Sequence, residues 1–184
     1  MNINILRDGG LAACFLVLMF LISQKIEADA VKTFTGRYRV VDGDSLALGK
    51  TRFRLKGIDA PELSQLCQRD GRPWNCGEAA KERLSAFMGA GNVDCKGGRK
   101  DKYGRLLVTC FAGAFNINQE MVRVGMAVTF GDYDAEERKA RDARAGIWAG
   151  DFTRPVDWRR MNKAGMDEEL HVPSFPWNLF GGRG

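Results

Sequence analysis

The chain has 184 residues, of which 45% are hydrophobic and 28% are charged, and its formal net charge is +5. This composition is that of an ordinary globular protein with one core, and it excludes a disordered or collagen-like chain. The modest basic excess favours polyanionic partners such as nucleic acids, although a plain soluble basic surface explains the charge equally well.

The first thirty residues have the pattern of a targeting segment. An apolar run over 11–22 follows a short polar segment with Arg7, and Ala28-Asp29-Ala30 is a small-x-small pattern suited to signal peptidase. The run is shorter than the roughly 20 apolar residues of a comfortable membrane span. We therefore predict a signal peptide over 1–30 and an exported protein, either periplasmic or secreted, with an uncleaved anchor over 11–22 as the alternative.

Strand patterns follow Gly36. A first strand with Tyr38, Val40 and Val41 leads into Asp42-Gly43-Asp44, which is a turn signal. A second strand is expected over 45–48, and Gly49-Lys50 suits a two-residue hairpin turn. Residues 51–58 alternate between apolar and basic side chains, which predicts one buried and one exposed strand face. Three antiparallel strands in quick succession indicate a curled sheet or a small barrel.

Helical and strand patterns then alternate to residue 150. Helices are expected over 78–88, from Asn116 to Gly125 with Asn116 as the N-cap, and over about 135–145; strands are expected over 92–96 and 105–111. These elements complete a domain over 31–150. Residues 151–184 contain three prolines and a glycine-rich end, and we expect them to form an irregular tail.

Four cysteines follow the targeting segment. Cys95 and Cys110 lie in segments that resemble neighbouring strands, and Cys67 and Cys76 flank one short loop. We therefore predict the disulfides Cys67–Cys76 and Cys95–Cys110, as an oxidising compartment allows. A zinc site is disfavoured because the sequence has no Cys-x-x-Cys pair and its single histidine, His171, lies far along the tail.

The histidine content also restricts the chemistry. Residues 31–170 contain no histidine, which excludes Ser-His-Asp and Cys-His catalysis unless His171 reaches back from the tail. Any hydrolytic centre must then consist of carboxylates, arginines and a metal ion. Such groups occur in three clusters, namely Asp42-Gly43-Asp44-Ser45, residues 54–62 (RLKGIDAPE) and Asp101-Lys102-Tyr103-Gly104-Arg105.

In their order and spacing, these clusters resemble the active-site signatures of the staphylococcal nuclease family. The resemblance continues through residues 118–125 (NQEMVRVG) and Gly146-Ile147-Trp148, and it covers about residues 34–148. It implies an α+β fold, a five-stranded OB-fold β-barrel with three α-helices. It also implies a nuclease that depends on Ca²⁺.

The resemblance assigns a role to each matched position. Asp44, Asp59 and the backbone carbonyl of Ala60 are expected to hold one Ca²⁺, which prefers hard oxygen ligands. Glu62 is expected to activate or position the attacking water, and Arg54 and Arg105 are expected to bind the phosphate. Lys102 and Tyr103 match residues that contact a neighbouring phosphate, and Phe130 lies near the position of a substrate-stacking tyrosine whose hydroxyl it lacks.

The function that this resemblance implies is hydrolysis of DNA and RNA, preferentially single-stranded, to 3′-phosphate and 5′-hydroxyl ends. We expect a monomer that needs no organic cofactor and contacts membrane only through an uncleaved N-terminal segment. The alternatives are an inactive OB-fold module that binds nucleic acid and an anchored protein whose barrel binds a protein partner. Retention of all five acidic and arginine positions favours the enzyme. The insertion over 63–75 is either a disulfide-stapled rim of the site or an unrelated loop.

Overall fold

The computed structural model of the protein describes residues 11–21 and 31–169, with side chains as far as residue 162. Residues 11–21 are helical and their apolar side chains are exposed. Within these described ranges, no helix has the length and apolar character needed to cross a membrane. The expected signal peptidase site at 28–30 and His171 lie outside the described residues.

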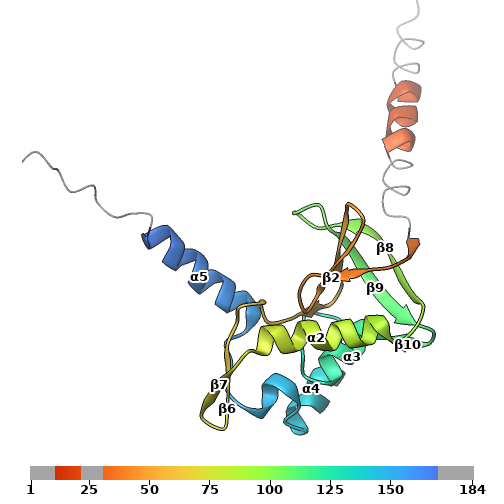
Figure 1. Ribbon diagram of the computed structural model, residues 1–184. Coiled ribbons are helices and arrows are strands. Elements are labelled where there is room, and N and C mark those ends of the chain that lie inside the picture. The colour runs from red at the N-terminus through yellow and green to blue at the C-terminus, as the bar shows by residue number, and fades with distance from the viewer. Residues whose placement is uncertain (1–10, 22–30, 170–184) are drawn as a thin grey trace, which may run out of the picture.

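A curled mixed sheet forms the body of the domain (Figure 1). Its strands follow the order β1-β8-β9-β4-β3-β2, and β10 pairs with β9. Their bounds are β1 Lys32–Thr35, β2 Arg39–Val40, β3 Ser45–Leu48, β4 Thr51–Leu55, β8 Val93–Lys100, β9 Leu106–Ala112 and β10 Phe115–Asn116. All pairs are antiparallel except β4 with β9, which run parallel. The α+β fold class is confirmed, and the curled sheet is consistent with an OB fold.

The number of strands exceeds the five predicted, because several strands are only two or three residues long. Two of them, β5 (Ile58–Asp59) and β11 (Val128–Thr129), form a separate antiparallel pair. Two others, β6 (Cys67–Arg69) and β7 (Arg72–Trp74), form a hairpin inside the insertion. Such strands are too short for a period of two to be visible in the sequence.

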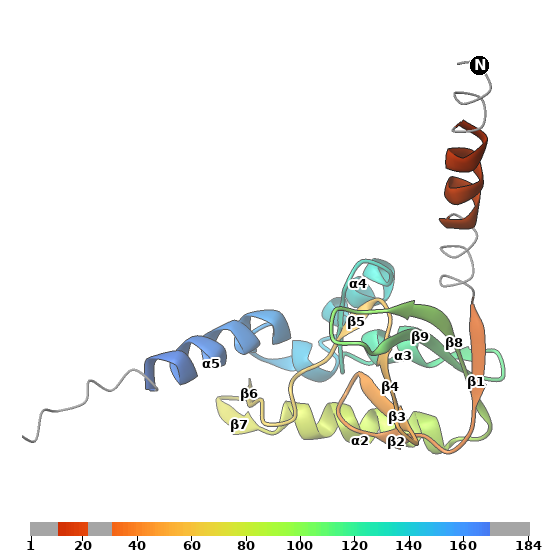
Figure 2. The ribbon, with the colours of Figure 1, turned by 90° about the horizontal axis from the view of Figure 1, so that it is seen from above.

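The helices that follow the first strands are α2 (Cys76–Gly89), α3 (Ile117–Arg123), α4 (Asp134–Asp142), a 3₁₀ turn (Gly146–Ala149) and α5 (Pro155–Glu169). Helices α2 and α3 lie beside the sheet, whereas α5 runs away from it (Figure 2). The side chain of Asn116 accepts a hydrogen bond from the backbone N–H of Gln119, 3.2 Å away, so the predicted N-cap of α3 is present.

Helix α5 corrects the prediction of an irregular tail, since residues 155–169 are helical. Pro155 occupies the first helical position, where its fixed φ is favourable and its missing N–H has no intrahelical partner to lose. Pro173, Pro176 and the glycine-rich end, on which the prediction of an irregular tail rests, lie beyond residue 169. The first turn of α5 begins next to the domain and the helix then runs outward (Figures 1 and 2).

The main core lies between the sheet and helices α2 and α3. Phe53 and Leu55 of β4 are buried, whereas Arg52 on the same strand is exposed, as the alternation predicted. Phe34 and Tyr38 pack edge-on against the ring of Phe53. A buried Phe side chain contributes several kcal/mol to the free energy of unfolding through burial and packing. Phe53 therefore fixes the position of β4, which also carries Arg54.

Both predicted disulfides are present. Cys95 and Cys110 face each other in the register of β8 and β9, with their Cα atoms 4.0 Å apart. Cys67–Cys76 closes the β6–β7 hairpin against the start of α2, with a Cα–Cα distance of 5.7 Å. This second disulfide belongs to a small core cluster with Val128 and Ile147.

The same cluster connects the hairpin to the segment that precedes α5. The rings of Trp148 and Phe152 pack edge to face, and both lie against the cluster. The backbone N–H of Gln68 donates to the carbonyl of Asp151 over 2.8 Å. A β-carbon at Gly150 would lie only 2.0 Å from the carbonyl oxygen of Gln68, so the two backbones approach as closely as glycine allows. The insertion therefore supports the chain that enters α5.

Candidate active site

The turn before β3 places Asp44 at the edge of the sheet. The side chain of Asp42 accepts a hydrogen bond from the backbone N–H of Asp44, 3.1 Å away, which is the turn contact that aspartate residues favour. Ser45, the next residue, faces Arg54 in the register of β3 and β4. The hairpin therefore brings the guanidinium of Arg54 beside the carboxylate of Asp44, and the two form an ion pair.

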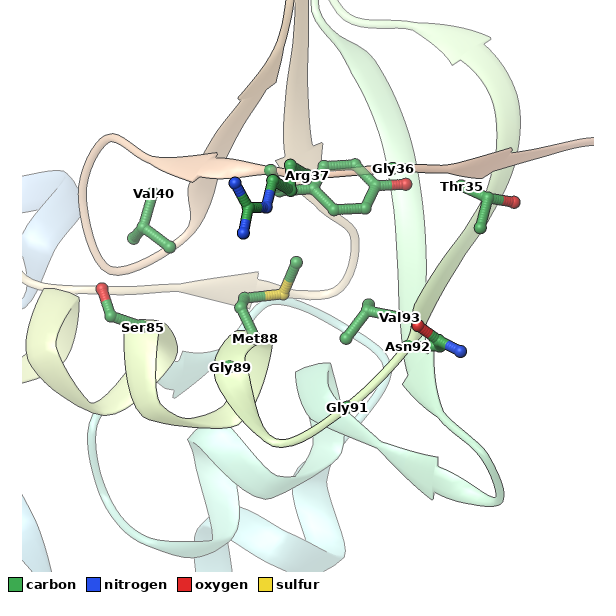
Figure 3. Close-up of a pocket in the computed structure, with 11 residues that line it drawn as sticks. Thr35, Gly36, Arg37, Val40, Ser85, Met88, Gly89, Gly91, Asn92 and Val93 are labelled. Atoms are coloured by element: carbon green, nitrogen blue, oxygen red, sulfur yellow. The ribbon is translucent and has the colours of Figure 1, made fainter.

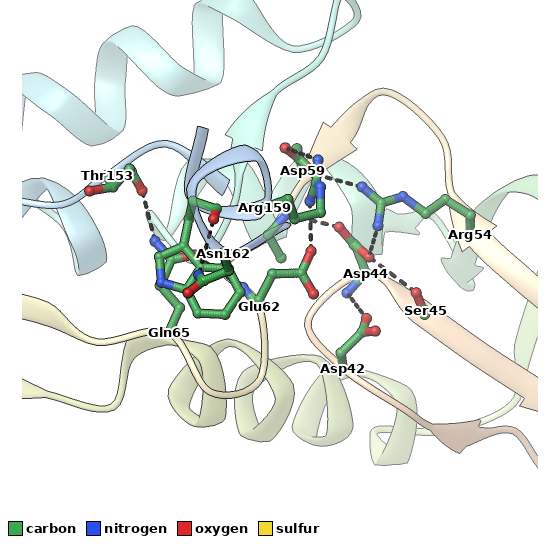
Figure 4. A network of polar contacts seen from close by, with 12 residues as sticks. Asp42, Asp44, Ser45, Arg54, Asp59, Glu62, Gln65, Thr153, Arg159 and Asn162 are labelled. Carbon is green, nitrogen blue, oxygen red and sulfur yellow. Dashed lines mark hydrogen bonds and ion pairs between the residues drawn. The ribbon is translucent and has the colours of Figure 1, made fainter. Parts of the chain in front are cut away.

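Asp59 reaches the same guanidinium from strand β5. Its Oδ1 accepts a hydrogen bond from Nη2 of Arg54 over 2.6 Å, while Nη1 of Arg54 binds Asp44. Both aspartates are 2% exposed. The backbone N–H of Ala60 donates to the second carboxylate oxygen of Asp44 over 2.9 Å. One arginine thus holds two buried carboxylates together (Figure 4).

The burial of this group has clear electrostatic effects. Burial raises the pKa of Asp44 to about 7, although the positive charge of Arg54 acts in the opposite direction. Burial alone would lower the pKa of Arg54, but the charges of Asp44 and Asp59 raise it above its ordinary value. The two carboxylates outnumber the one guanidinium that joins them, so the group favours an additional cation.

Arg159 of α5 supplies that positive charge, and no motif in the sequence indicates this role. Its Nη1 and Nη2 donate to the two carboxylate oxygens of Asp59, each over 3.0 Å, and Nη1 also donates to Oε1 of Glu62 over 2.7 Å. Burial alone would lower the pKa of Arg159, but these hydrogen bonds and charges raise it above its ordinary value. Figure 4 shows Arg159 between Asp59 and Glu62.

The position of Glu62 is fixed through its backbone by Gln65, which is fully buried. The backbone N–H of Gln65 donates to the carbonyl of Glu62 over 2.8 Å, and the side-chain oxygen of Gln65 accepts from the N–H of Glu62 over 3.2 Å. The side-chain nitrogen of Gln65 donates to the carbonyl of Thr153 over 2.7 Å. Gln65 therefore joins the turn of Glu62 to the beginning of α5.

The first turn of α2 packs directly on Glu62. A β-carbon at Gly77 would lie 1.8 Å from the carbonyl oxygen of Glu62. We therefore expect Gly77→Ala to lower the free energy of unfolding by about 1–3 kcal/mol, because the Glu62 turn must move away. The measurement is denaturant unfolding beside Gly89→Ala, since a β-carbon at Gly89, in the last turn of the same helix, has no atom within 4 Å. Equal stability of the two variants would contradict the close contact.

The loop between β8 and β9 carries three further predicted residues. Asp101 accepts from the backbone N–H groups of Tyr103 and Arg105, and its carboxylate forms an ion pair with the guanidinium of Arg105 over 2.7 Å. The charged groups of Lys102 and Arg105 lie 5.0 Å and 5.4 Å from the ring centroid of Tyr103. The structure therefore groups Lys102, Tyr103 and Arg105 in one loop, with Arg105 paired to Asp101.

Phe130 follows β11 and is 71% exposed, as is Tyr103. Its backbone N–H donates to the carbonyl of Gly57 over 2.8 Å, which ties it to the turn between Arg54 and Asp59. An exposed aromatic ring at a fixed place is suited to stacking on a nucleic acid base.

The donor set of this site agrees in chemistry with Ca²⁺. Asp44, Asp59 and Glu62 supply hard carboxylate oxygens, and when all three are ionised they carry, together with Arg54, two net negative charges, which matches one divalent cation. Among the described residues, no group of three or more His, Cys, Asp or Glu side chains is gathered as closely as a metal centre would require. Arg54 and Arg159 lie between the carboxylates.

A separate cavity of about 760 Å³ lies at the other end of α2 (Figure 3). Arg37, Tyr38 and Met88 are among its lining residues. The carboxylates adjoin the first turn of α2 through Gly77, whereas Met88 lies in its last turn. The cavity is therefore not part of the acidic site.

Comparison with known proteins identifies the family of the chain. The family model described as staphylococcal nuclease homologue matches residues 52–150, a range that contains Arg54, Asp59, Glu62 and Arg105. The chain is 32% identical over 130 residues to the succinoglycan biosynthesis protein ExoI of Rhizobium meliloti, covering 66% of this chain and 68% of that protein. It is 31% identical over 140 residues to an uncharacterized endonuclease of Haemophilus influenzae, covering 70% and 74%.

A plant relative is longer. The chain is 29% identical over 144 residues to the probable staphylococcal-like nuclease CAN2 of rice, covering 73% of this chain but only 37% of that protein. The match therefore concerns one part of the rice protein. The matched region includes more than half of the present chain and three residues of the acidic site, Arg54, Asp59 and Glu62. The chain belongs to the staphylococcal nuclease family, a family of phosphodiester-hydrolysing nucleases.

Proposed function

We propose that the protein is an exported, Ca²⁺-dependent nuclease that cleaves DNA and RNA, preferentially single strands, and leaves 3′-phosphate and 5′-hydroxyl ends. The observation that carries this proposal is the meeting of Asp44, Asp59 and Glu62 around the guanidinium groups of Arg54 and Arg159. Carboxylates and arginines in one place are the groups that phosphodiester hydrolysis needs when no histidine takes part.

Asp44 and Asp59, with the backbone carbonyl of Ala60, are the proposed ligands of Ca²⁺. When bound, Ca²⁺ would act as a Lewis acid toward the phosphate. The Glu62 side chain is 29% exposed, more than either aspartate, so a water molecule can reach its carboxylate. Glu62 is the proposed group that accepts or directs the proton of the attacking water.

Arg54 and Arg105 are the proposed phosphate-binding residues. A guanidinium can meet two equatorial phosphate oxygens at once, and one such donor contributes about 3 kcal/mol to the transition state. Arg105 pairs with Asp101 within its loop, so binding a phosphate requires it to leave that partner. Lys102 lies in the same loop and is proposed to contact an adjacent phosphate.

The exposed rings of Tyr103 and Phe130 support a preference for single strands. Unpaired bases can stack on such rings, and stacking tolerates any base because every base has a π-face. We therefore propose little sequence specificity. We also propose that the protein acts as a monomer, since each residue assigned above comes from one chain.

Export is proposed on two observations. The N-terminal segment has the pattern of a signal peptide, and the domain contains two disulfides, which persist in oxidising compartments. N-terminal sequencing of the natural protein is expected to begin near Val31, whereas an intact N-terminus would indicate an uncleaved anchor.

One cleavage assay tests the nuclease proposal. The full chain is incubated with labelled single-stranded DNA in Ca²⁺ or in chelator, and cleavage is expected only with Ca²⁺. Arg105→Ala is expected to lower kcat roughly 100-fold, on the scale of losing one oxyanion donor. Arg52→Ala, which removes an exposed arginine from β4, is the matched control and should cleave normally. Tight binding of DNA without cleavage would instead identify an inactive binding module.

A further inference from the structure

The beginning of α5 is held against the domain by several independent contacts. Gln65 binds the carbonyl of Thr153, and Arg154 forms an ion pair of 3.1 Å with Glu137 of α4. The ring of Phe152 packs on Trp148, next to the disulfide-bonded hairpin. Because these residues lie immediately before Pro155, the direction of the first turns of α5 is fixed by the fold. Arg159 therefore reaches the carboxylates from an anchored helix.

Arg159 occupies the oxygens that a cation would need. Oδ1 of Asp59 accepts from both Arg54 and Arg159, and Oδ2 of Asp59 accepts from Arg159. The oxygens of Asp44 accept from Arg54, Ser45 and the backbone of Ala60. A cation that binds Asp59 meets the positive charge of Arg159 on the same carboxylate, so the two compete for it.

The two guanidiniums differ in how easily they can leave. The Arg54 side chain is 16% exposed and joins two buried aspartates, whereas the Arg159 side chain is 40% exposed and lies on the solvent side. Arg159 can be hydrated when it moves away, which lowers the cost of its release. Charge balance agrees, because the three carboxylates with Arg54 alone are neutralised by one divalent cation.

We propose that Arg159 is a built-in competitor of the metal ion. In the metal-free protein it holds Asp59 and Glu62, and cation binding releases it. This inference rests on the proposed Ca²⁺ site and adds a regulatory residue to it. Metal binding and the contact of Arg159 with Asp59 and Glu62 are therefore thermodynamically linked, since each favours the loss of the other. The apparent affinity for Ca²⁺ equals the intrinsic affinity multiplied by the fraction of molecules in which Arg159 is released.

Calorimetric titration of the full chain with Ca²⁺, in the absence of nucleic acid, tests this proposal. Arg159→Ala is expected to bind Ca²⁺ roughly tenfold more tightly than the wild type, within the range of typical couplings between sites. Arg159→Lys keeps the charge but loses the fork that meets both oxygens of Asp59, so its affinity should lie between the two. Thermal unfolding of each variant checks that it is folded.

The control is Arg160→Ala, which removes the same charge one residue along α5. Arg160 is 76% exposed and pairs with Asp157 in its own helix, so its removal should leave the Ca²⁺ affinity within about twofold of the wild type. Equal or weaker affinity in Arg159→Ala, with clear Ca²⁺ binding by the wild type, would overturn the competition and leave the nuclease proposal intact. Absence of Ca²⁺ binding in every variant would overturn both.

Discussion

Arg54→Ala is expected to abolish Ca²⁺-dependent cleavage and to lower the free energy of unfolding by about 3–5 kcal/mol. Asp44 and Asp59 are each 2% exposed, and Arg54 is the guanidinium that both of them bind. Without it, two carboxylates of like charge stay buried near each other, and the phosphate loses a bidentate donor. Guanidinium chloride unfolding in chelator measures the stability, and the cleavage assay measures the activity.

The stability loss should be smaller in Ca²⁺, because the cation replaces part of the missing positive charge and binds only the folded protein. Arg54→Lys keeps one charge but loses the planar fork that bridges the two carboxylates, so we expect its stability to lie between those of Arg54→Ala and the wild type and its activity to be far below that of the wild type. Arg52→Ala on the same strand again serves as the control. If Arg54→Ala were as stable as this control in chelator, the bridging contact would not hold the site together.

Glu62→Gln is expected to lower kcat by roughly 10²–10⁴-fold, which is the usual contribution of a general base. The substitution preserves the size of the side chain and its backbone contacts with Gln65. Because the Glu62 side chain is 29% exposed, the free energy of unfolding should change by less than about 0.5 kcal/mol. Steady-state kinetics on single-stranded DNA separates kcat from KM, and KM should change little.

The matched control is Glu82→Gln, which removes an exposed carboxylate from α2. It should leave both kinetic constants unchanged. An effect of Glu62→Gln on KM alone would assign Glu62 to substrate binding, and the proposed role in proton transfer would then be wrong.

The effects of substituting Arg54 and Glu62 on cleavage are also expected to be non-additive, because both residues act on the same transition state.

Local signals in the sequence account for much of this fold. The turn at Gly49-Lys50, the alternation along β4 and the N-cap at Asn116 each involve residues close together in the chain, and all three are found in the structure. The proximity of Asp44 and Arg54 follows from the same hairpin, because its register sets Ser45 opposite Arg54. Both disulfides could be predicted because their cysteines flank a single hairpin each.

The contacts that were missed join distant parts of the chain. Arg159 meets Asp59 across 100 residues and Glu62 across 97, and no period or spacing rule relates such positions. Pro155 was a usable signal for the start of α5, but the direction of a helix depends on what anchors it. One of its anchors is Gln65, a polar residue near the start of the insertion, whose burial the sequence alone does not indicate.

The parallel pairing of β4 with β9 also affects when the nuclease can first become active. Leu107 of β9 lies beside Arg54 of β4, and Asp59 of β5 pairs with Val128 of β11. Both β4 and β5, which carry residues of the site, therefore pair with strands that lie much later in the chain. Such distant pairings form late in folding, because the intervening chain must first be closed into loops. A chain still emerging from the ribosome therefore lacks the complete site until the residues of β9 and β11 have been synthesised.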